Sequence, residues 1–277
     1  MRNEPGRLSP RQLGALALTA SELPIFRVCV RLSWPWVLLG GGAAAGLLSL
    51  LTARRNRRRA PRGNDRRAGT GRRWPVLLLP LVPLAAREAI YSFPETADSL
   101  LAALLVLALA FAAAWQGAEA AGRCAGILLP VTAALCGGVL VFSLPGLRWE
   151  WLRPAGSPAQ ATAAFAVLLL PGAALALEPA LEPGARLPHW PWWSGAAAAA
   201  AASAVTAGIL SPELAAQPEA FRTLARGVSV LGVMRRFEAL VNGAMLMAGF
   251  CLCTLLLRAV FTELQGKAAE KSGGKKF

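Results

Sequence analysis

Ionisable side chains inside long apolar runs are the residues of this sequence whose types could do chemistry. They are Glu22, Arg27, Arg87, Glu88 and Glu238. A charge at membrane depth is costly, so such a side chain usually faces a cavity or a partner. Glu22 is the strongest candidate because it lies near the middle of its run, with Thr19 and Ser21 beside it. For Arg27 and Glu238, a position at the membrane surface with the charge reaching water is an equally good interpretation.

Two proline-containing stretches predict breaks in the helices that hold these residues. Leu23-Pro24 interrupts the first apolar run, and Pro171-Gly172 lies in the middle of the sixth. Proline removes one backbone hydrogen bond, and glycine relaxes the turn. Within a membrane, the freed backbone groups are tolerated where they line a cavity enclosed by protein. Paired breaks in the first and sixth spans are typical of inverted-repeat transporters, so the sequence predicts a midplane pocket for a small solute.

The elements that must position these residues are predicted to be membrane helices. The chain has 277 residues, of which 55% are hydrophobic and 16% charged, whereas soluble domains are nearer 25% charged. A soluble helical bundle would show a polar stripe on each helix, and residues 100–114 show none. We therefore predict an all-α polytopic membrane protein whose single transmembrane domain covers residues 1–262. Its eight predicted spans are residues 12–30, 34–52, 74–93, 99–115, 124–144, 161–177, 192–210 and 237–262.

Local signals add detail to three of these spans. Ser9 and Pro10 predict the start of the first helix, with Ser9 as the N-cap. Gly40-Gly41-Gly42 and Gly46 give the second span a face of small residues that permits close helix packing. The seventh span is marginal, because its alanine run is barely hydrophobic enough to insert.

The net charge of +14 is concentrated in one predicted loop, residues 53–73. Ten arginines against Asp65 alone give 10 − 1 = +9 there. Between membrane spans, such a run marks the cytoplasmic side and favours contact with anionic lipids. We therefore expect cytoplasmic N- and C-termini, a lysine-containing cytoplasmic tail at 263–277, and no nucleic-acid binding. The arginines of the extramembrane segment 211–235 count against this topology, but the loop outweighs them.

The sequence favours no enzyme and no cofactor. It contains no hydrolase, kinase or zinc-protease motif and no phosphate-binding glycine loop. The lone His189 cannot form a metal site, so no metal is expected. All five cysteines lie in or next to apolar spans, which makes a disulfide framework an unlikely interpretation.

Several stretches of the sequence are similar to the motifs of one known family. LSPRQL at 8–13 resembles the motif ISxxQL. Arg87-Glu88 followed by SFPET at 92–96 resembles the end of a third helix before LPxTP. WQGAEAAGRCAGILLP at 115–130 resembles ARKGIEVIGRxxEILFP, and FSLPGLRWEWLRP at 142–154 resembles LPxxxxxNLLP. ILSPEL at 209–214 with RRFEAL at 235–240 resembles LGPEL and ERIEALF. In their order and spacing, these stretches resemble the B subunits of bacterial spore germinant receptors (the GerAB and GerKB proteins), in the amino-acid permease (APC) superfamily.

The sequence also departs from that family. The family typically has ten helices in an APC/LeuT-like inverted repeat, and this chain is expected to lack the last two. The FPFGE of the family's sixth helix is here Leu170-Pro171-Gly172-Ala173, without the glutamate.

The resemblance implies a nutrient-sensing subunit in the inner membrane of the spore. It would bind a small germinant, typically an amino acid, and would work with an A-type subunit and a C-type lipoprotein. Glu22 would receive the ammonium group of the ligand and Arg87 its carboxylate. The expected ligand-binding residues are Thr19, Ser21, Glu22, Pro24, Arg87, Glu88, Pro171, Gly172, Glu238 and Asn242. An ion-coupled amino-acid transporter of the same fold and a degenerate structural subunit without ligand are the alternatives.

Overall fold

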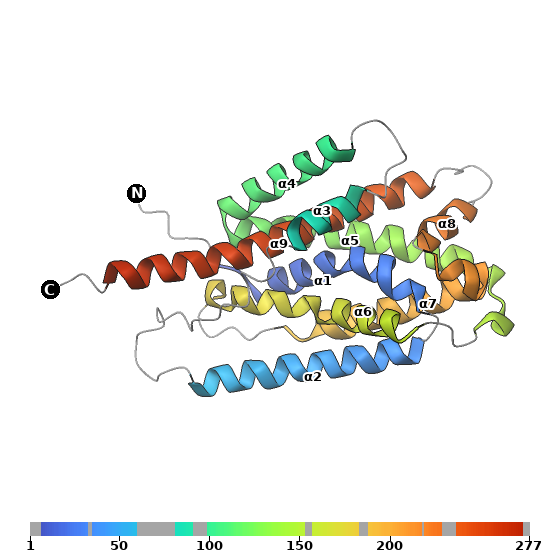
Figure 1. The fold of residues 1–277 in the computed structure, drawn as a ribbon, viewed down its shortest axis with the longest axis horizontal. Helices are drawn as coiled ribbons and strands as arrows, with labels where there is room; N and C mark the ends of the chain where they lie inside the picture. The colour runs from blue at the N-terminus through green and yellow to red at the C-terminus, as the bar shows by residue number, and fades with distance from the viewer. Residues whose placement is uncertain are drawn as a thin grey trace.

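The computed structural model describes residues 7–32, 35–59, 81–90, 99–152, 157–182, 188–217, 219–228 and 237–273. This part of the chain is all-helical, with one isolated β-bridge and no strand. The helices lie side by side as an elongated bundle (Figure 1). In chain order the α-helices are α1 (Pro10–Val28), α2 (Pro35–Arg59), α3 (Leu81–Ile90), α4 (Ser99–Gln116), α5 (Ala118–Ser143), α6 (Pro158–Leu169), α7 (Trp190–Ala215), α8 (Ala220–Gly227) and α9 (Phe237–Gly273). The short 3₁₀ segments are η1 (Cys29–Arg31), η3 (Leu144–Gly146) and η4 (Trp149–Trp151), and a longer one, η5 (Leu170–Ala180), follows α6.

Four helices of the described chain are long and apolar enough to cross a membrane. They are Pro10–Arg31, Ala118–Gly146, Trp190–Ser211 and Phe237–Thr262. Three further apolar helices are shorter, at Pro35–Leu48, Leu101–Gln116 and Pro158–Ala174. Large apolar side chains point outward from α2, α4 and α5, among them Leu47, Leu105 and Ile127. So much exposed apolar surface is typical of a protein that faces lipid, and we conclude that the chain is a membrane protein.

Helix α1 lies at the centre of the bundle, where it packs against α5, α6, η5, α7 and α9 (Figure 1). Its start is the one predicted, because Ser9 is the N-cap and forms a reciprocal capping box with Gln12. Most of its side chains are buried on all sides. A helix in this position can hold a polar side chain away from both water and lipid.

The two predicted helix breaks turn out differently. The break expected at Pro24 was wrong, since α1 continues as an α-helix through Pro24 to Val28. Proline already has a helical φ and removes only one hydrogen bond, and packing on every side of α1 compensates for that loss. The break at Pro171 is present, because α6 ends at Leu169 and the backbone becomes the 3₁₀ segment η5. A 3₁₀ segment of 11 residues is unusually long.

Backbone hydrogen bonds fasten the beginning of α1 to the end of η5. The Leu8 amide donates to the Ala180 carbonyl at 2.9 Å, and the Glu182 amide donates to the Leu8 carbonyl at 3.1 Å. These bonds form the bridge between Leu8 and Leu181. They hold the first and sixth helical units together at one end.

Helix α2 packs closely on α7 through the small residues that the sequence predicted for this purpose. A side chain at Gly42 would collide with Ala196, and one at Gly46 would meet Trp192 at 3.7 Å. The contact therefore depends on the absence of a Cβ atom at Gly42.

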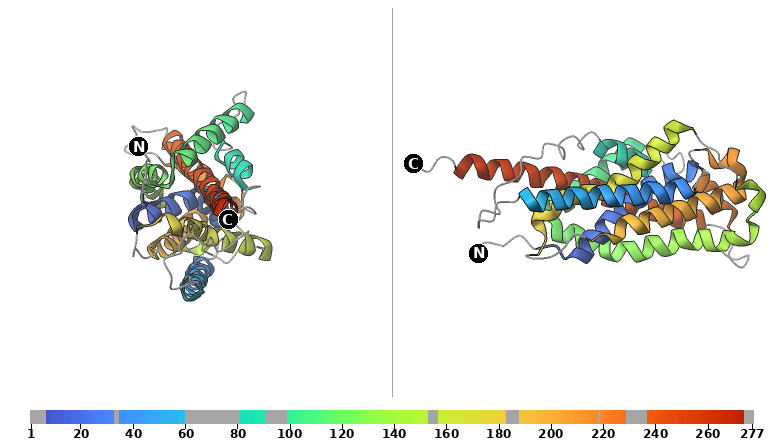
Figure 2. Two further views of the ribbon diagram at one scale, coloured as in Figure 1. Left: turned by 90° about the vertical axis from the view of Figure 1, so that its left-hand side faces the viewer. Right: turned by 90° about the horizontal axis from the view of Figure 1, so that it is seen from below.

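The two ends of the bundle differ in character. The beginning of α1, the end of α2 and the C-terminal part of α9 lie at one end, and α8 lies at the other (Figure 1). Helix α9 runs for 37 residues and projects beyond its neighbours (Figure 2). It includes residues 263–273 of the expected tail, which are rich in the strong helix formers Ala, Glu, Lys and Gln. Of the arginine-rich loop, residues 53–59 continue α2, and 60–73 lie outside the described residues.

Candidate functional site

Two side chains of α1 form a polar group inside the bundle, which we call the interior pair. Thr19 is 0% exposed and Glu22 is 7% exposed. Within the described structure, the Thr19 Oγ1 and the Glu22 Oε2 have no hydrogen-bond partner. Buried polar atoms are rarely left without a partner, because each one costs about 1–3 kcal/mol. The interior pair is therefore a place where a bound group would be stabilised.

Helices α5 and α9 supply the surroundings of Glu22. The Thr132 hydroxyl of α5 lies within hydrogen-bonding reach of the Glu22 carboxyl and also donates to the Leu129 carbonyl at 3.2 Å. Cys136 of α5 and Cys251 of α9 lie within range of its charge. The surroundings of the carboxyl thus include one hydroxyl and two thiols.

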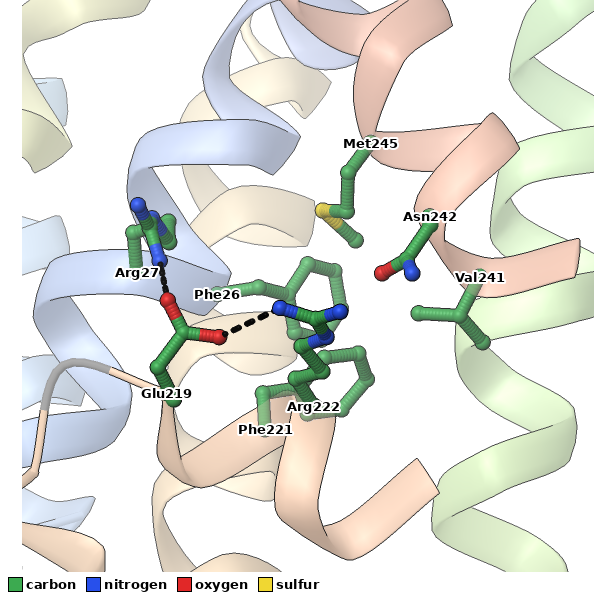
Figure 3. A pocket seen from close by; sticks show the side chains of 8 residues that line it. All are labelled: Phe26, Arg27, Glu219, Phe221, Arg222, Val241, Asn242 and Met245. Carbon is green, nitrogen blue, oxygen red and sulfur yellow. Dashed lines mark hydrogen bonds and ion pairs between the residues drawn. The ribbon is translucent and has the colours of Figure 1, made fainter. Parts of the chain in front are cut away.

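A second polar region, the end pocket, lies between α1, α8 and α9 (Figure 3). It is lined by Phe26, Arg27, Glu219, Phe221, Arg222, Val241, Asn242 and Met245. Its volume is about 20 Å³, which is room for a water molecule or a group of similar size. In its present form, the end pocket is too small for a whole amino acid.

A chain of ion pairs closes the outer side of the end pocket. Glu219 accepts from Nη1 of Arg27 at 3.1 Å and from Nη1 of Arg222 at 3.1 Å. Glu238 accepts from Nε of Arg222 at 2.6 Å and from Nε of Arg226 at 2.8 Å. The hydrogen bond to Glu238 raises the pKa of Arg226 above its ordinary value. Helices α1, α8 and α9 are therefore tied together by alternating charges.

Local sequence explains why α8 reaches this position. Phe221, Leu224 and Ala225 are buried on one side of α8, and Arg222 and Arg226 lie on the other. The Phe221 ring packs on Phe26 with the centroids 4.3 Å apart. Burial of two aromatic rings docks the helix on the bundle, and this docking places its arginines beside α9.

The interior pair and the end pocket lie along the same side of α1. Phe26 follows Glu22 by four residues, which is about 6 Å along a helix and the same face. Phe26 lines the end pocket together with Met245 of α9. Two apolar side chains, Phe26 and Met245, therefore form part of the wall of the end pocket.

The other expected ligand-binding residues fall in several places. Ser21 donates to the Leu18 carbonyl at 2.7 Å and approaches α7 near Gly195, so it faces away from Thr132. Pro171 and Gly172 begin η5, which packs against α1. Arg87 is exposed on α3, which gives no support to a role opposite Glu22, and the structure does not describe the Glu88 side chain. Glu238 and Asn242 are brought together at the end pocket.

Sequence inspection alone did not identify three of the contributing residues. Thr132 places a hydroxyl in the middle of a largely apolar span. A polar residue in such a position could have been recognised in the sequence as a candidate site residue. Glu219 and Arg222 were counted only as charges of the extramembrane segment 211–235, whereas the spacing of Arg222 and Arg226 from Phe221 and Leu224 indicates an amphipathic helix.

No family model matches this chain, and no curated protein matches it.

Proposed function

We propose that the chain is a membrane-embedded sensor of a small nutrient, of the kind found as B subunits of spore germinant receptors. The nutrient would be an amino acid or another small amine, and the protein would act by changing conformation and not by catalysis. The fold would be an eight-span bundle of the amino-acid permease type. The support is the order of sequence motifs together with an all-helical membrane bundle whose central helix bears a buried carboxyl.

The observation that carries the proposal is the interior pair. Glu22 and Thr19 each bury a polar atom that has no partner among the described residues, inside a helix long and apolar enough to span a membrane. Ionisable side chains in such positions commonly mark a ligand or ion pathway. A ligand ammonium group is a suitable partner, since it donates several hydrogen bonds and neutralises the Glu22 carboxylate.

The closed packing around Glu22 favours a sensor. Helix α1 packs against α5, α9 and η5, so a ligand at the buried interior pair must separate α1 from at least one of its neighbours. A ligand shifts a conformational equilibrium only by its differential affinity for the two states. Binding that requires opening supplies such a difference, and the 3₁₀ segment η5 is the neighbour of α1 most suited to move.

The proposed setting follows from the charge distribution. We propose that the N- and C-termini and the arginine-rich loop face the cytoplasm, where the loop contacts anionic lipids. The beginning of α1 and the end of α2 lie at the same end of the bundle, as this topology requires (Figure 1). Helix α8 would then face outward. The partners would be an A-type receptor subunit and a lipoprotein, in the spore inner membrane or the cell membrane.

An ion-coupled amino-acid transporter of the same fold is the second candidate, and the same residue favours it. A carboxyl that is buried at membrane depth beside a hydroxyl is a typical element of proton-coupled transport.

Binding and flux, measured on one preparation, distinguish the two functions. The purified full chain would be reconstituted in nanodiscs and in liposomes, and a mixture of radiolabelled L-amino acids would be the probe. Saturable binding without uptake supports the sensor, and uptake supports the transporter. If the amino acids neither bind to the protein nor enter the liposomes, the sensor and transporter hypotheses are both wrong for amino acids. The hypothesis of a structural subunit without ligand is then favoured.

A further inference from the structure

Helix α9 buries an arginine that has no carboxylate partner among the described residues. Arg258 is 9% exposed, and none of the ion pairs in the described part of the chain includes it. Its Nη1 donates to the Ala114 carbonyl at 3.4 Å, which is longer than a typical hydrogen bond. Its Nε is buried without a partner among the described residues. A buried cation is costly unless an opposite charge and hydrogen bonds compensate for it, so an anion would be stabilised beside Arg258.

The end of α4 compensates for only part of this charge. Ala114 lies in the last turn of α4, where the carbonyls without a helical partner carry a partial negative charge. A guanidinium has five N–H groups to donate, and one long hydrogen bond uses one of them. Capping of α4 therefore leaves other donors of Arg258, among them Nε, for a further acceptor.

The spacing of charges along α9 indicates that Arg258 lies at the depth of the lipid headgroups. Arg258 follows Glu238 by 20 residues, with no charged residue between them. This separation is about 30 Å along a helix, which is about the thickness of the hydrocarbon core of a bilayer. Glu238 pairs with the exposed Arg226 at one end of the bundle, so Arg258 is expected at the opposite face of the membrane.

Three aromatic rings, which we call the aromatic cluster, lie beside Arg258. Phe111 and Trp115 of α4 and Phe261 of α9 have their centroids 5.4, 5.9 and 6.0 Å apart. Trp115 is 73% exposed and Phe111 is 48% exposed. Trp115 follows Ala114, which accepts from Arg258, and Phe261 lies three residues beyond Arg258 on the same side of α9. Exposed tryptophan next to a cationic side chain is typical of the membrane interface.

We propose that Arg258 and the aromatic cluster bind one anionic phospholipid, with its phosphate on the guanidinium and an acyl chain against the rings. A guanidinium matches a phosphate in charge and in geometry, and exposed aromatic rings offer an apolar surface to the chain. The single negative charge of the lipid would neutralise Arg258. Changes of side-chain rotamer are common on binding, and the exposed Trp115 is able to move aside. The inference goes beyond the proposed function and does not depend on it, since it concerns α4 and α9 and not the interior pair.

The test is thermal unfolding of the purified full chain in detergent with short-chain lipids added. Dihexanoyl phosphatidylglycerol, which has one negative charge, would be compared with dihexanoyl phosphatidylcholine, which has no net charge, and with inorganic phosphate. All samples would contain about 1 M sodium chloride, because a Debye length of about 3 Å weakens lipid binding at exposed arginines elsewhere on the chain. With phosphatidylglycerol we expect a saturable rise in Tm, on the order of 5 °C at a hundredfold excess over Kd. Phosphatidylcholine and inorganic phosphate should give no comparable rise.

Substitutions connect the rise in Tm to this site. Arg258→Gln should lose the rise, and Arg258→Lys should keep a smaller part of it, because an ammonium group lacks the planar pair of donors. Trp115→Ala should weaken the affinity for phosphatidylglycerol severalfold, and this exposed position keeps the test decisive if Arg258→Gln does not fold. Two controls should keep the full rise. They are Arg123→Gln, which removes an exposed arginine paired with Glu119, and Trp36→Ala, which removes a tryptophan 81% exposed on α2.

Four results would overturn the inference. An equal rise with phosphatidylcholine would mean that general contact with lipid stabilises the chain. An unchanged rise in Arg258→Gln would mean that Arg258 only caps α4. A rise with inorganic phosphate that Arg258→Gln abolishes would assign the site to a soluble phosphate. A wild-type chain that does not respond to phosphatidylglycerol would favour a carboxylate of a protein partner as the counter-ion. None of these results bears on amino-acid binding at Glu22, so failure here is separate from failure of the proposed function.

Discussion

Arg222 of α8 donates from Nε to Oε1 of Glu238 on α9 at 2.6 Å, and both side chains are largely shielded from solvent. Glu238 also accepts from Arg226, whose side chain is 56% exposed. One carboxylate thus holds a shielded cation and an exposed cation of the same short helix. This arrangement permits a comparison of the two pairs within one molecule.

The shielded pair should contribute more to stability than the exposed pair. A double-mutant cycle of Arg222→Met and Glu238→Gln should give a coupling of about 1–2 kcal/mol, since hydrogen bonds between charged groups exceed neutral ones when solvent is excluded. The corresponding cycle with Arg226→Met should give less than about 1 kcal/mol. Denaturant unfolding in detergent measures both, and an equal coupling in the two cycles would contradict the solvent-exclusion argument.

A strained backbone at the kink in α7 predicts a stabilising substitution. Ser211 has φ 71° and ψ 156°, a region that is almost restricted to glycine and costs about 1–3 kcal/mol for other residues. Ser211→Gly should therefore stabilise the chain by about 1 kcal/mol, after allowance for the greater freedom of glycine when unfolded. Ser211→Ala is the control, because alanine loses the hydroxyl but keeps the Cβ atom, and no gain is expected. A similar rise in Tm in both variants would mean that the backbone conformation of Ser211 is not the cause of the stabilisation.

Two glycines that lie two residues apart in α2, on different faces of the helix, give a matched test of helix packing. A Cβ atom at Gly42 would approach the Ala196 Cα to 3.4 Å and would lie still closer to its Cβ, whereas one at Gly40 would meet nothing within 4 Å. Gly42→Ala should destabilise the α2–α7 contact by about 1–3 kcal/mol. Gly40→Ala should be neutral or stabilising by up to about 1 kcal/mol, because alanine favours a helix. Equal effects on Tm would mean that α2 does not pack as described.

The proposed topology can be tested by labelling at the two ends of the bundle. The side chains of Arg226 on α8 and Arg123 near the start of α5 are both exposed, and α8 and the start of α5 lie at opposite ends of the bundle (Figure 1). In intact cells, a membrane-impermeant maleimide should label Arg226→Cys and should label Arg123→Cys only after permeabilisation. The native chain is the control for background, since four of its five cysteines are buried. The opposite labelling pattern would reverse the proposed orientation.

The sequence predicted those structural features that depend mainly on residues close together in the chain. Ser9 and Pro10 specify the start of α1 through capping, and Gly42 predicts close packing through the lack of a side chain. Pro171 marks the end of α6, because proline removes a backbone hydrogen bond and the glycine after it lowers the stability of a helix. These predictions need only the nearest residues along the chain.

Features that depend on neighbours in space were less predictable. Pro24 has the same chemistry as Pro171, yet α1 stays helical because it is enclosed on every side. The sequence could not show that Arg222 would meet Glu238, since that contact depends on how α8 docks. Likewise, Arg87 was expected to bind the carboxylate of the ligand, and the sequence could not show that its side chain is exposed on α3.

Binding of labelled L-amino acids to Glu22→Gln is the most direct test of the central claim, that the interior pair on α1 is the ligand site. The variant keeps the shape of the side chain and removes its charge, so it should lose at least tenfold in affinity while it folds and assembles normally. Ser143→Ala is the control: it removes a buried hydroxyl that has no partner among the described residues. Ser143 lies eleven residues beyond Thr132 on α5, about 16 Å along the helix, so this variant should bind like the wild type. Wild-type affinity in a correctly folded Glu22→Gln protein would contradict the account.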